Sequence, residues 1–171
     1  MAGHYCLNCG SALAPRMIEE RELEACPNCD FVLWRDPKVV TMVVVEDGEG
    51  GVVVGRRAIN PGYGLWCLPG GYVNDDEHPA EAAARECREE ILAEVTITSL
   101  LDVYHIDAES GPSMLALAYR GRLASGPVGA GPEMLEVRSF PPRALPPLAF
   151  SSHGQAMRDW LDHRQSALER T

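Results

Sequence analysis

The sequence predicts an α/β domain that follows a small cysteine-rich module. Two C-x2-C pairs lie within the first 29 residues, and valine-rich runs typical of buried strands come after them. Over residues 79–91, apolar side chains recur at spacings of three and four, which indicates an amphipathic helix. A chain of 171 residues, 46% of them hydrophobic, can build one substantial core and one small extra module. We place the boundary between residues 1–36 and residues 37–171.

The cysteine pairs predict a structural zinc site. Sixteen residues separate the pairs, and this spacing is typical of tetrahedral Zn²⁺ bound by four thiolates, here Cys6, Cys9, Cys26 and Cys29. Residues 17–25 can form a β-hairpin between the pairs, so residues 1–36 are expected to be a zinc ribbon. A module this short needs the metal to fold, and four thiolates leave no open position for catalysis. We therefore expect an architectural role, either covering the following domain or forming a homodimer.

The larger domain is predicted to begin with a strand that is apolar enough to be buried on both faces. Glycine-rich residues 47–51 then turn the chain back into a second strand. The predicted strands cover residues 38–46, 52–54, 94–106, 113–123 and 134–140. Between the last two, residues 124–132 form a connection long enough to act as a lid. A terminal helix is expected to begin with a capping box formed by Ser152 and Gln155.

The helix over residues 79–91 carries a dense group of acidic side chains. Pro79 suits its first position, and His78 is expected to be a mediocre cap. Three carboxylates fall on one face within a single turn, although like charges so close repel one another: Glu86, Glu89 and Glu90. A solvated acidic surface is one explanation. The other is a hard divalent cation such as Mg²⁺, which binds carboxylate oxygens together with water and substrate phosphates.

The residues before this turn favour the metal site. From Gly71 to Glu90 the chain reads G-x5-E-x7-R-E-C-R-E-E, which resembles the signature of the Nudix hydrolases. The resemblance implies a Nudix fold, with a mixed sheet sandwiched between helices, and Mg²⁺- or Mn²⁺-dependent hydrolysis of a diphosphate linked to another group. It also implies residue roles. Metal is held by Glu86, Glu89, Glu90 and the Gly71 carbonyl, while Glu77 and Arg85 brace the loop against the helix.

Two positions depart from the family pattern. Cys87 stands where the family has an aliphatic residue, and a small buried thiol changes little there. Leu92 stands where the family has a glycine that lets the helix end in a left-handed turn. The helix is therefore expected to end differently or to run on.

Further candidates lie outside the signature. Arg56 and Arg57 can clamp substrate phosphates or can be charges at the surface end of a strand. In many Nudix enzymes a glutamate from a late loop acts as a base or extra metal ligand. The resemblance therefore points to Glu133 as a catalytic residue, with Glu136 as the second choice.

The substrate is the least determined part of the prediction. A zinc ribbon before a Nudix domain resembles NADH pyrophosphatases, but the S-Q-P-W motif of those enzymes is missing here. The whole chain more closely resembles Nudix proteins that hydrolyse FAD or ADP-ribose, which implies cleavage into two monophosphates by attack of a water that a glutamate deprotonates. Aromatic residues that one sequence cannot place around a ligand must set the specificity, among them Tyr63, Trp66, Tyr72 and Phe150.

Charge and composition limit the other possibilities. A net charge of −10 argues against a nucleic-acid partner, because binding to phosphate backbones depends on Lys and Arg. The longest apolar run is far shorter than a membrane span, and there is no basic-then-apolar leader, so a cytoplasmic protein without membrane contact is expected. Three alternatives stay open: hydrolysis of NADH or of normal or oxidised nucleoside triphosphates, a sensor that binds ADP-ribose without cleaving it, and a zinc-ribbon adaptor for a protein partner.

Overall fold

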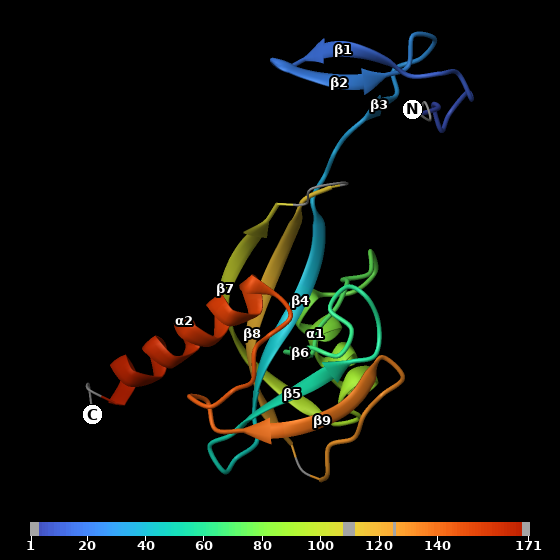
Figure 1. Cartoon of the computed structure of the whole chain (residues 1–171). Coiled ribbons are helices and arrows are strands. Elements are labelled where there is room, and N and C mark those ends of the chain that lie inside the picture. Colours follow the sequence, from blue (N-terminus) through green and yellow to red (C-terminus); the bar gives the residue numbers. More distant parts are fainter. Residues whose placement is uncertain (1–3, 108–111, 125, 169–171) are drawn as a thin grey trace. The chain divides into compact units, whose positions relative to one another are not determined.

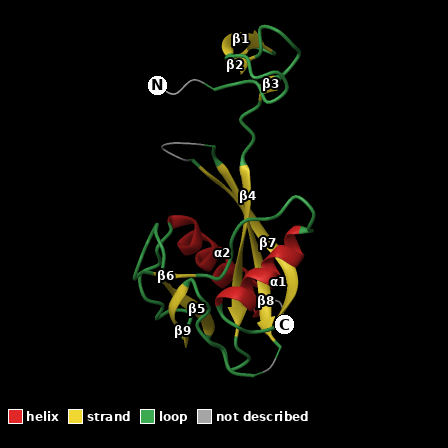
Figure 2. Cartoon of the chain, turned by 90° about the vertical axis from the view of Figure 1, so that its right-hand side faces the viewer, coloured by secondary structure: helices red, strands yellow, loops and turns green. Residues whose placement is uncertain are grey.

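A computed structural model describes residues 4–107, 112–124 and 126–168 (Figures 1 and 2). The chain forms two compact units, the first ending at Asp36 and the second starting at Pro37. Neither helix in these described ranges combines the length and the apolar character needed to span a lipid bilayer.

The first unit is a three-stranded antiparallel sheet with two cysteine-containing turns. Its strands are β1 (Ala14–Ile18), β2 (Arg21–Ala25) and β3 (Val32–Leu33), in the order β1-β2-β3. The β1–β2 hairpin starts three residues earlier than the 17–25 arm expected from the sequence, and its turn residues Glu19 and Glu20 both have positive φ. Each C-x2-C pair lies in a tight turn, closed by the bonds from Cys6 N–H to the Ser11 carbonyl and from Cys26 N–H to the Phe31 carbonyl, both 2.8 Å.

The second unit is built on a mixed sheet, as predicted. Its strands are β4 (Lys38–Glu46), β5 (Val52–Arg57), β6 (Trp66–Cys67), β7 (Val95–Ile106), β8 (Met114–Leu123) and β9 (Met134–Phe140). The order is β6-β5-β4-β8-β7, with β9 paired to β5. Strands β4 and β8 run parallel, and the other pairs are antiparallel.

Two helices cover the two faces of this sheet (Figure 1). Helix α1 is Pro79–Glu90 and α2 is Ser151–Leu168. Alternate residues of β4 point to opposite faces, so Met42 packs in the core with Trp160 of α2 while Val43 packs in the core with Cys87 of α1. The sequence prediction of a sheet between helices is confirmed.

Strands β4 and β5 pair at only two positions next to their connecting turn and then separate. The chain segment after β6 takes the place beside β4 that β5 leaves. Three backbone hydrogen bonds of 2.8–3.0 Å join this segment to β4. Val43 N–H donates to the Pro69 carbonyl and Thr41 N–H to the Gly71 carbonyl, while Val73 N–H donates to the carbonyl of Val39 in β4. The segment that carries Gly70 and Gly71 is thus tied to a central strand by backbone hydrogen bonds.

Helix α1 begins at Pro79 as predicted, but its cap and the start of α2 differ from the sequence prediction. His78 is a good cap, because its ring accepts from Ala80 N–H while the Glu81 side chain accepts from the His78 N–H, which completes a capping box. Helix α2 begins at Ser151, so Ser152 lies inside the first turn and does not occupy the predicted cap position.

Candidate active site

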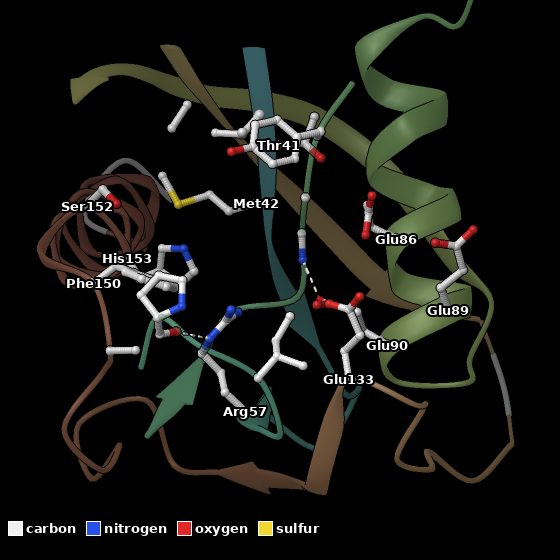
Figure 3. A pocket seen from close by; sticks show the side chains of 18 of the residues that line it. Thr41, Met42, Arg57, Glu86, Glu89, Glu90, Glu133, Phe150, Ser152 and His153 are labelled. Carbon is white, nitrogen blue, oxygen red and sulfur yellow. Dashed lines mark hydrogen bonds between the residues drawn. The ribbon is translucent and has the colours of Figure 1, made fainter. Parts of the chain in front are cut away.

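Four glutamates line the same end of a cavity of about 1140 Å³ in the second unit (Figure 3). Three come from the last turns of α1 and one from the loop before β9: Glu86, Glu89, Glu90 and Glu133. Figure 3 shows Met42, Arg57, Phe150, Ser152 and His153 on the opposite side of this cavity. The cavity therefore has an acidic end and a mixed apolar and cationic end.

Arg85 connects the helix to the loop in front of it. Its guanidinium donates to both carboxylate oxygens of Glu77, at 2.7 and 3.0 Å, and to the Tyr72 carbonyl at 2.9 Å. A third nitrogen bonds Glu86 at 2.7 Å and Glu89 at 3.2 Å. Hydrogen bonds from Arg85 and from the Asn74 N–H lower the pKa of Glu77 to about 2. The structure thus brings Glu77 and Arg85 together in a bidentate pair, and Glu86 and Glu89 bind the same arginine.

Glu90 and Glu86 are the buried members of the acidic group. Burial raises the pKa of Glu90 to about 8, opposed by the Gly70 N–H that donates to its carboxylate at 2.8 Å, and the charges of Glu86 and Glu133 add to the rise. Burial also raises the pKa of Glu86, together with the charges of Glu89 and Glu133. Neighbouring negative charges raise the pKa of Glu86 and of Glu90 because they make a further negative charge less favourable.

Gly70 and Gly71 have no side chains, which lets this segment lie close to the β4 backbone and to the Glu86 carboxylate. A Cβ at Gly71 would lie 2.6 Å from the Glu86 carboxylate, and a Cβ at Gly70 would lie 2.1 Å from the Thr41 carbonyl oxygen. Gly70 also has φ of +155°. The Gly71 carbonyl accepts from Thr41 N–H, which leaves one of its two lone pairs for another partner.

The loop that carries Glu133 is fixed to the C-terminal end of α1. Gly129 N–H and Gly131 N–H donate to the last carbonyls of the helix, those of Ile91 and Glu90, both at 2.9 Å. This half of the 124–132 segment is therefore anchored and does not act as a free lid. The expectation for Leu92 was also wrong: Leu92 takes φ of +50°, so it adopts the left-handed conformation itself and the helix ends there.

The two arginines at the end of β5 separate. Arg57 lines the cavity, donates to the Pro61 carbonyl at 2.7 Å and stacks over the Phe150 ring at 5.1 Å. Arg56 instead donates to the Gly64 carbonyl and is not among the residues that line the cavity. Glu136 pairs with Arg138 along β9, also outside the lining.

Comparison with protein-family models matches residues 36–161 to the NUDIX domain. The chain belongs to the Nudix family. Its fold resembles that of a Nudix hydrolase from Nitrosomonas europaea, with 30% identity and a TM-score of 0.84 over 95% of this chain and 92% of the other. In sequence it is 28% identical, over 89% of its length and 86% of the relative's, to an ADP-ribose pyrophosphatase of Methanocaldococcus jannaschii. The Nudix domain of Shewanella oneidensis NrtR, solved with ADP-ribose, shares the fold at a TM-score of 0.65 and 18% identity over 76% of this chain and 90% of the other.

The donor groups of this Nudix hydrolase fit a divalent cation at the acidic end. Mg²⁺ is held by one or two carboxylates, with water and substrate phosphate oxygens completing its shell. Burial and neighbouring negative charges raise the pKa values of Glu86 and Glu90, and a bound cation would oppose this rise. Among the described residues, only the four cysteines bring all their ligand atoms within 4.8 Å of one another. The carboxylates are spread more widely, which suits a shell completed by water and substrate.

The cysteine group of this Nudix hydrolase has the dimensions of a zinc site. The Sγ atoms of Cys6 and Cys29 lie 3.5 Å apart, as do those of Cys9 and Cys26, and Cys9 and Cys29 lie 3.9 Å apart. Tetrahedral Zn²⁺ with Zn–S bonds of about 2.3 Å sets sulfur atoms about 3.8 Å apart. The four thiols are therefore already arranged around a position that Zn²⁺ can occupy.

Three cavity residues of this Nudix hydrolase were missed from the sequence. His153, Ser152 and Thr41 all line the cavity, and the Thr41 hydroxyl is the one buried side-chain polar atom in the described ranges that has no hydrogen-bond partner. No motif marks Thr41 or His153, and Ser152 was predicted only as a helix cap. Of the aromatic candidates, Phe150 and Tyr72 line the cavity, whereas Trp66 packs edge-on against Phe140 at 5.1 Å.

Proposed function

We propose that this Nudix hydrolase cleaves a nucleoside diphosphate linked to a second group, with ADP-ribose as the favoured substrate and FAD as the second. The observation that carries the proposal is the two-ended cavity. A diphosphate alone would need only the acidic end, whereas a cavity of about 1140 Å³ with an apolar and aromatic far end suits a substrate with a large organic part. The similarity to an ADP-ribose pyrophosphatase supports ADP-ribose ahead of the other candidates.

The residues proposed to hold divalent cations are Glu86, Glu89 and Glu90, with the Gly71 carbonyl. When bound, such cations neutralise the diphosphate and make water a better nucleophile at neutral pH. Arg85 holds Glu86 and Glu89 in place through its fixed hydrogen bonds, and the Gly70 N–H orients Glu90. Arg57, on the far side of the cavity, is proposed to bind a phosphate oxygen.

Glu133 is proposed as the general base. Within the described chain its carboxylate has no hydrogen-bond donor, so it is available to take a proton. Its backbone carbonyl accepts from Ala58 N–H at 2.8 Å, which fixes the residue against the end of β5. In the proposed step, water attacks one phosphorus, Glu133 accepts the water proton, and the bridging P–O bond breaks to give two monophosphates.

The first unit is proposed to be a zinc ribbon with an architectural role, and the unit from Pro37 on to be the hydrolase domain. Four cysteine ligands would close the coordination shell, so the zinc would stabilise the fold without taking part in hydrolysis. A homodimer is the partner arrangement we propose to test by light scattering.

A substrate panel tests the proposal. The purified chain is incubated with Mg²⁺ or Mn²⁺ and FAD, ADP-ribose, NADH, diadenosine polyphosphates, or normal and oxidised nucleoside triphosphates. Release of AMP from ADP-ribose, with kcat/KM at least about tenfold above that for triphosphates, supports it. Cleavage of triphosphates alone would show that the substrate assignment is wrong. Binding of ADP-ribose without turnover would replace the enzyme with the sensor alternative.

A further inference from the structure

The far end of the cavity contains a hydrogen-bond donor whose identity is fixed by the structure. His153, in the first turn of α2, accepts a hydrogen bond at its Nδ1 from the Leu68 N–H at 3.0 Å. A ring nitrogen that accepts cannot carry a proton, so in the neutral imidazole the proton sits on Nε2. Burial and the charge of Arg57 lower the pKa of His153 to about 4, which keeps the ring neutral at physiological pH. His153 therefore presents an Nε2–H donor.

This donor is held in place and has no partner in the described part of the chain. The Leu68 bond fixes one side of the ring, and Phe150 packs against it with ring centroids 5.0 Å apart at 63°. The described residues offer no acceptor to Nε2, and the residue lines the cavity. A donor that is already oriented loses little entropy when a ligand binds.

The surroundings of His153 suit a flat aromatic ring better than a phosphate. Met42 and Ala116 are almost fully buried side chains of the cavity wall, and Ile106 and Met114 extend the same apolar surface. The neutral imidazole itself offers no charge to an anion. Ligand pockets of this kind bind apolar rings and use a few polar groups to fix their orientation.

Arg57 is the cationic group at this far end of the cavity. Its charge acts on Glu90 at one end and on His153 at the other, so it lies near enough to influence both. The guanidinium is the cation at this end that can bind a phosphate, and the apolar side chains of the same end can contact the group attached to that phosphate.

We propose that His153 is a specificity-determining residue, whose Nε2–H donates to an acceptor nitrogen of the substrate's nucleobase in the apolar end of the cavity. The proposal rests on the proposed function, in which ADP-ribose is hydrolysed, and assigns the adenine ring to this end. The alternative is that His153 only ties α2 to the Leu68 segment.

Two substitutions separate the roles of the two ring nitrogens. In His153→Asn the amide oxygen takes the place of Nδ1 and still accepts from Leu68 N–H, but the shorter side chain does not reach the position of Nε2. In His153→Gln the amide reaches that position and can donate, but the acceptor for Leu68 N–H is lost. We expect His153→Asn to retain the thermal midpoint and to raise the KM for ADP-ribose about three- to tenfold with kcat little changed. We expect His153→Gln to lower the midpoint and keep KM near the wild-type value.

Deaza analogues identify the acceptor. ADP-ribose in which N1, N3 or N7 of adenine is replaced by CH is compared in wild type and His153→Asn. For one analogue, the KM of wild type should be about three- to tenfold higher than for ADP-ribose. The substitution His153→Asn should not raise the KM for that analogue further. If His153→Asn raises KM by the same factor for ADP-ribose and for all three analogues, the assignment of the base to this site is overturned. KM values that follow the thermal midpoint, with Gln worse than Asn, would show a purely structural role.

Calorimetric titration of the full chain with AMP and with each deaza-AMP keeps the test independent of turnover. If wild type hydrolyses no diphosphate substrate, the proposed function fails, while a loss of AMP affinity confined to His153→Asn still supports the base site. If ADP-ribose is hydrolysed but no affinity or KM depends on His153, the base site fails and the proposed function stands.

Discussion

The neutral, buried state of His153 predicts an acid-sensitive contribution to stability. Its pKa is lowered to about 4 in the folded chain, mainly by burial, against an ordinary value near 6.5 in the unfolded chain. Between these values the unfolded state binds a proton that the folded state does not, so the free energy of unfolding falls as the pH falls from about 6.5 to about 4. A difference of about 2.5 pKa units at about 1.4 kcal/mol per unit gives a loss of about 3 kcal/mol across this window.

The assay is urea unfolding of wild type and His153→Asn at intervals from pH 7.5 to 4.5. Other titrating groups, including the carboxylates of α1 with raised pKa, affect both proteins alike and cancel in the difference. We expect the stability of wild type relative to His153→Asn to be constant above about pH 7 and to fall with decreasing pH, by up to about 3 kcal/mol. A difference that stays flat, or that grows in favour of wild type as the pH falls, would refute the reasoning.

Three further predictions concern the acidic site and the metal. Glu89→Gln should lower kcat at saturating Mg²⁺ by at least about a hundredfold, with an unchanged circular dichroism spectrum; a normal kcat would remove this helix from the mechanism. Atomic emission should find about one zinc per wild-type chain, and the double substitution Cys26→Ala and Cys29→Ala should remove it. Full retention of zinc in this variant would contradict the four-cysteine site. Gly131→Ala should lower kcat at least about tenfold, because its Cβ would lie 1.8 Å from the Glu89 carbonyl oxygen and must displace the loop that carries Glu133, the proposed base. Gly154→Ala, whose Cβ would lie 3.6 Å from the flexible end of an arginine, should leave kcat unchanged.

The elements that were predicted well are those whose signal lies within one segment of sequence. The β4 strand was read correctly from its apolar run, and α1 from its spacing and from Pro79. The contact between Glu77 and Arg85 was implied by the resemblance to the Nudix signature, which lies within one loop–helix unit, and the structure contains this ion pair. In each case the neighbours that decide the structure are close in the chain.

The errors arose where a distant segment decides the outcome. Leu92 takes a left-handed conformation at the end of α1, where Gly129 N–H and Gly131 N–H bond to the Ile91 and Glu90 carbonyls. That conformation costs a residue with a Cβ about 1–2 kcal/mol. His153 is likewise defined by a bond to Leu68, 85 positions earlier. Sequence spacing carries no information about either contact.

The early separation of β4 and β5 affects how this hydrolase can evolve. The gap between the two strands is filled by the segment around Gly71, so the position of this segment at the acidic end depends on main-chain hydrogen bonds that most substitutions leave intact. The far end is lined by side chains such as Met42, Met114 and His153, whose sizes and polarity change with a single codon. Substrate preference can therefore drift while the hydrolytic step is preserved, and libraries restricted to the far end are a practical route to new specificities.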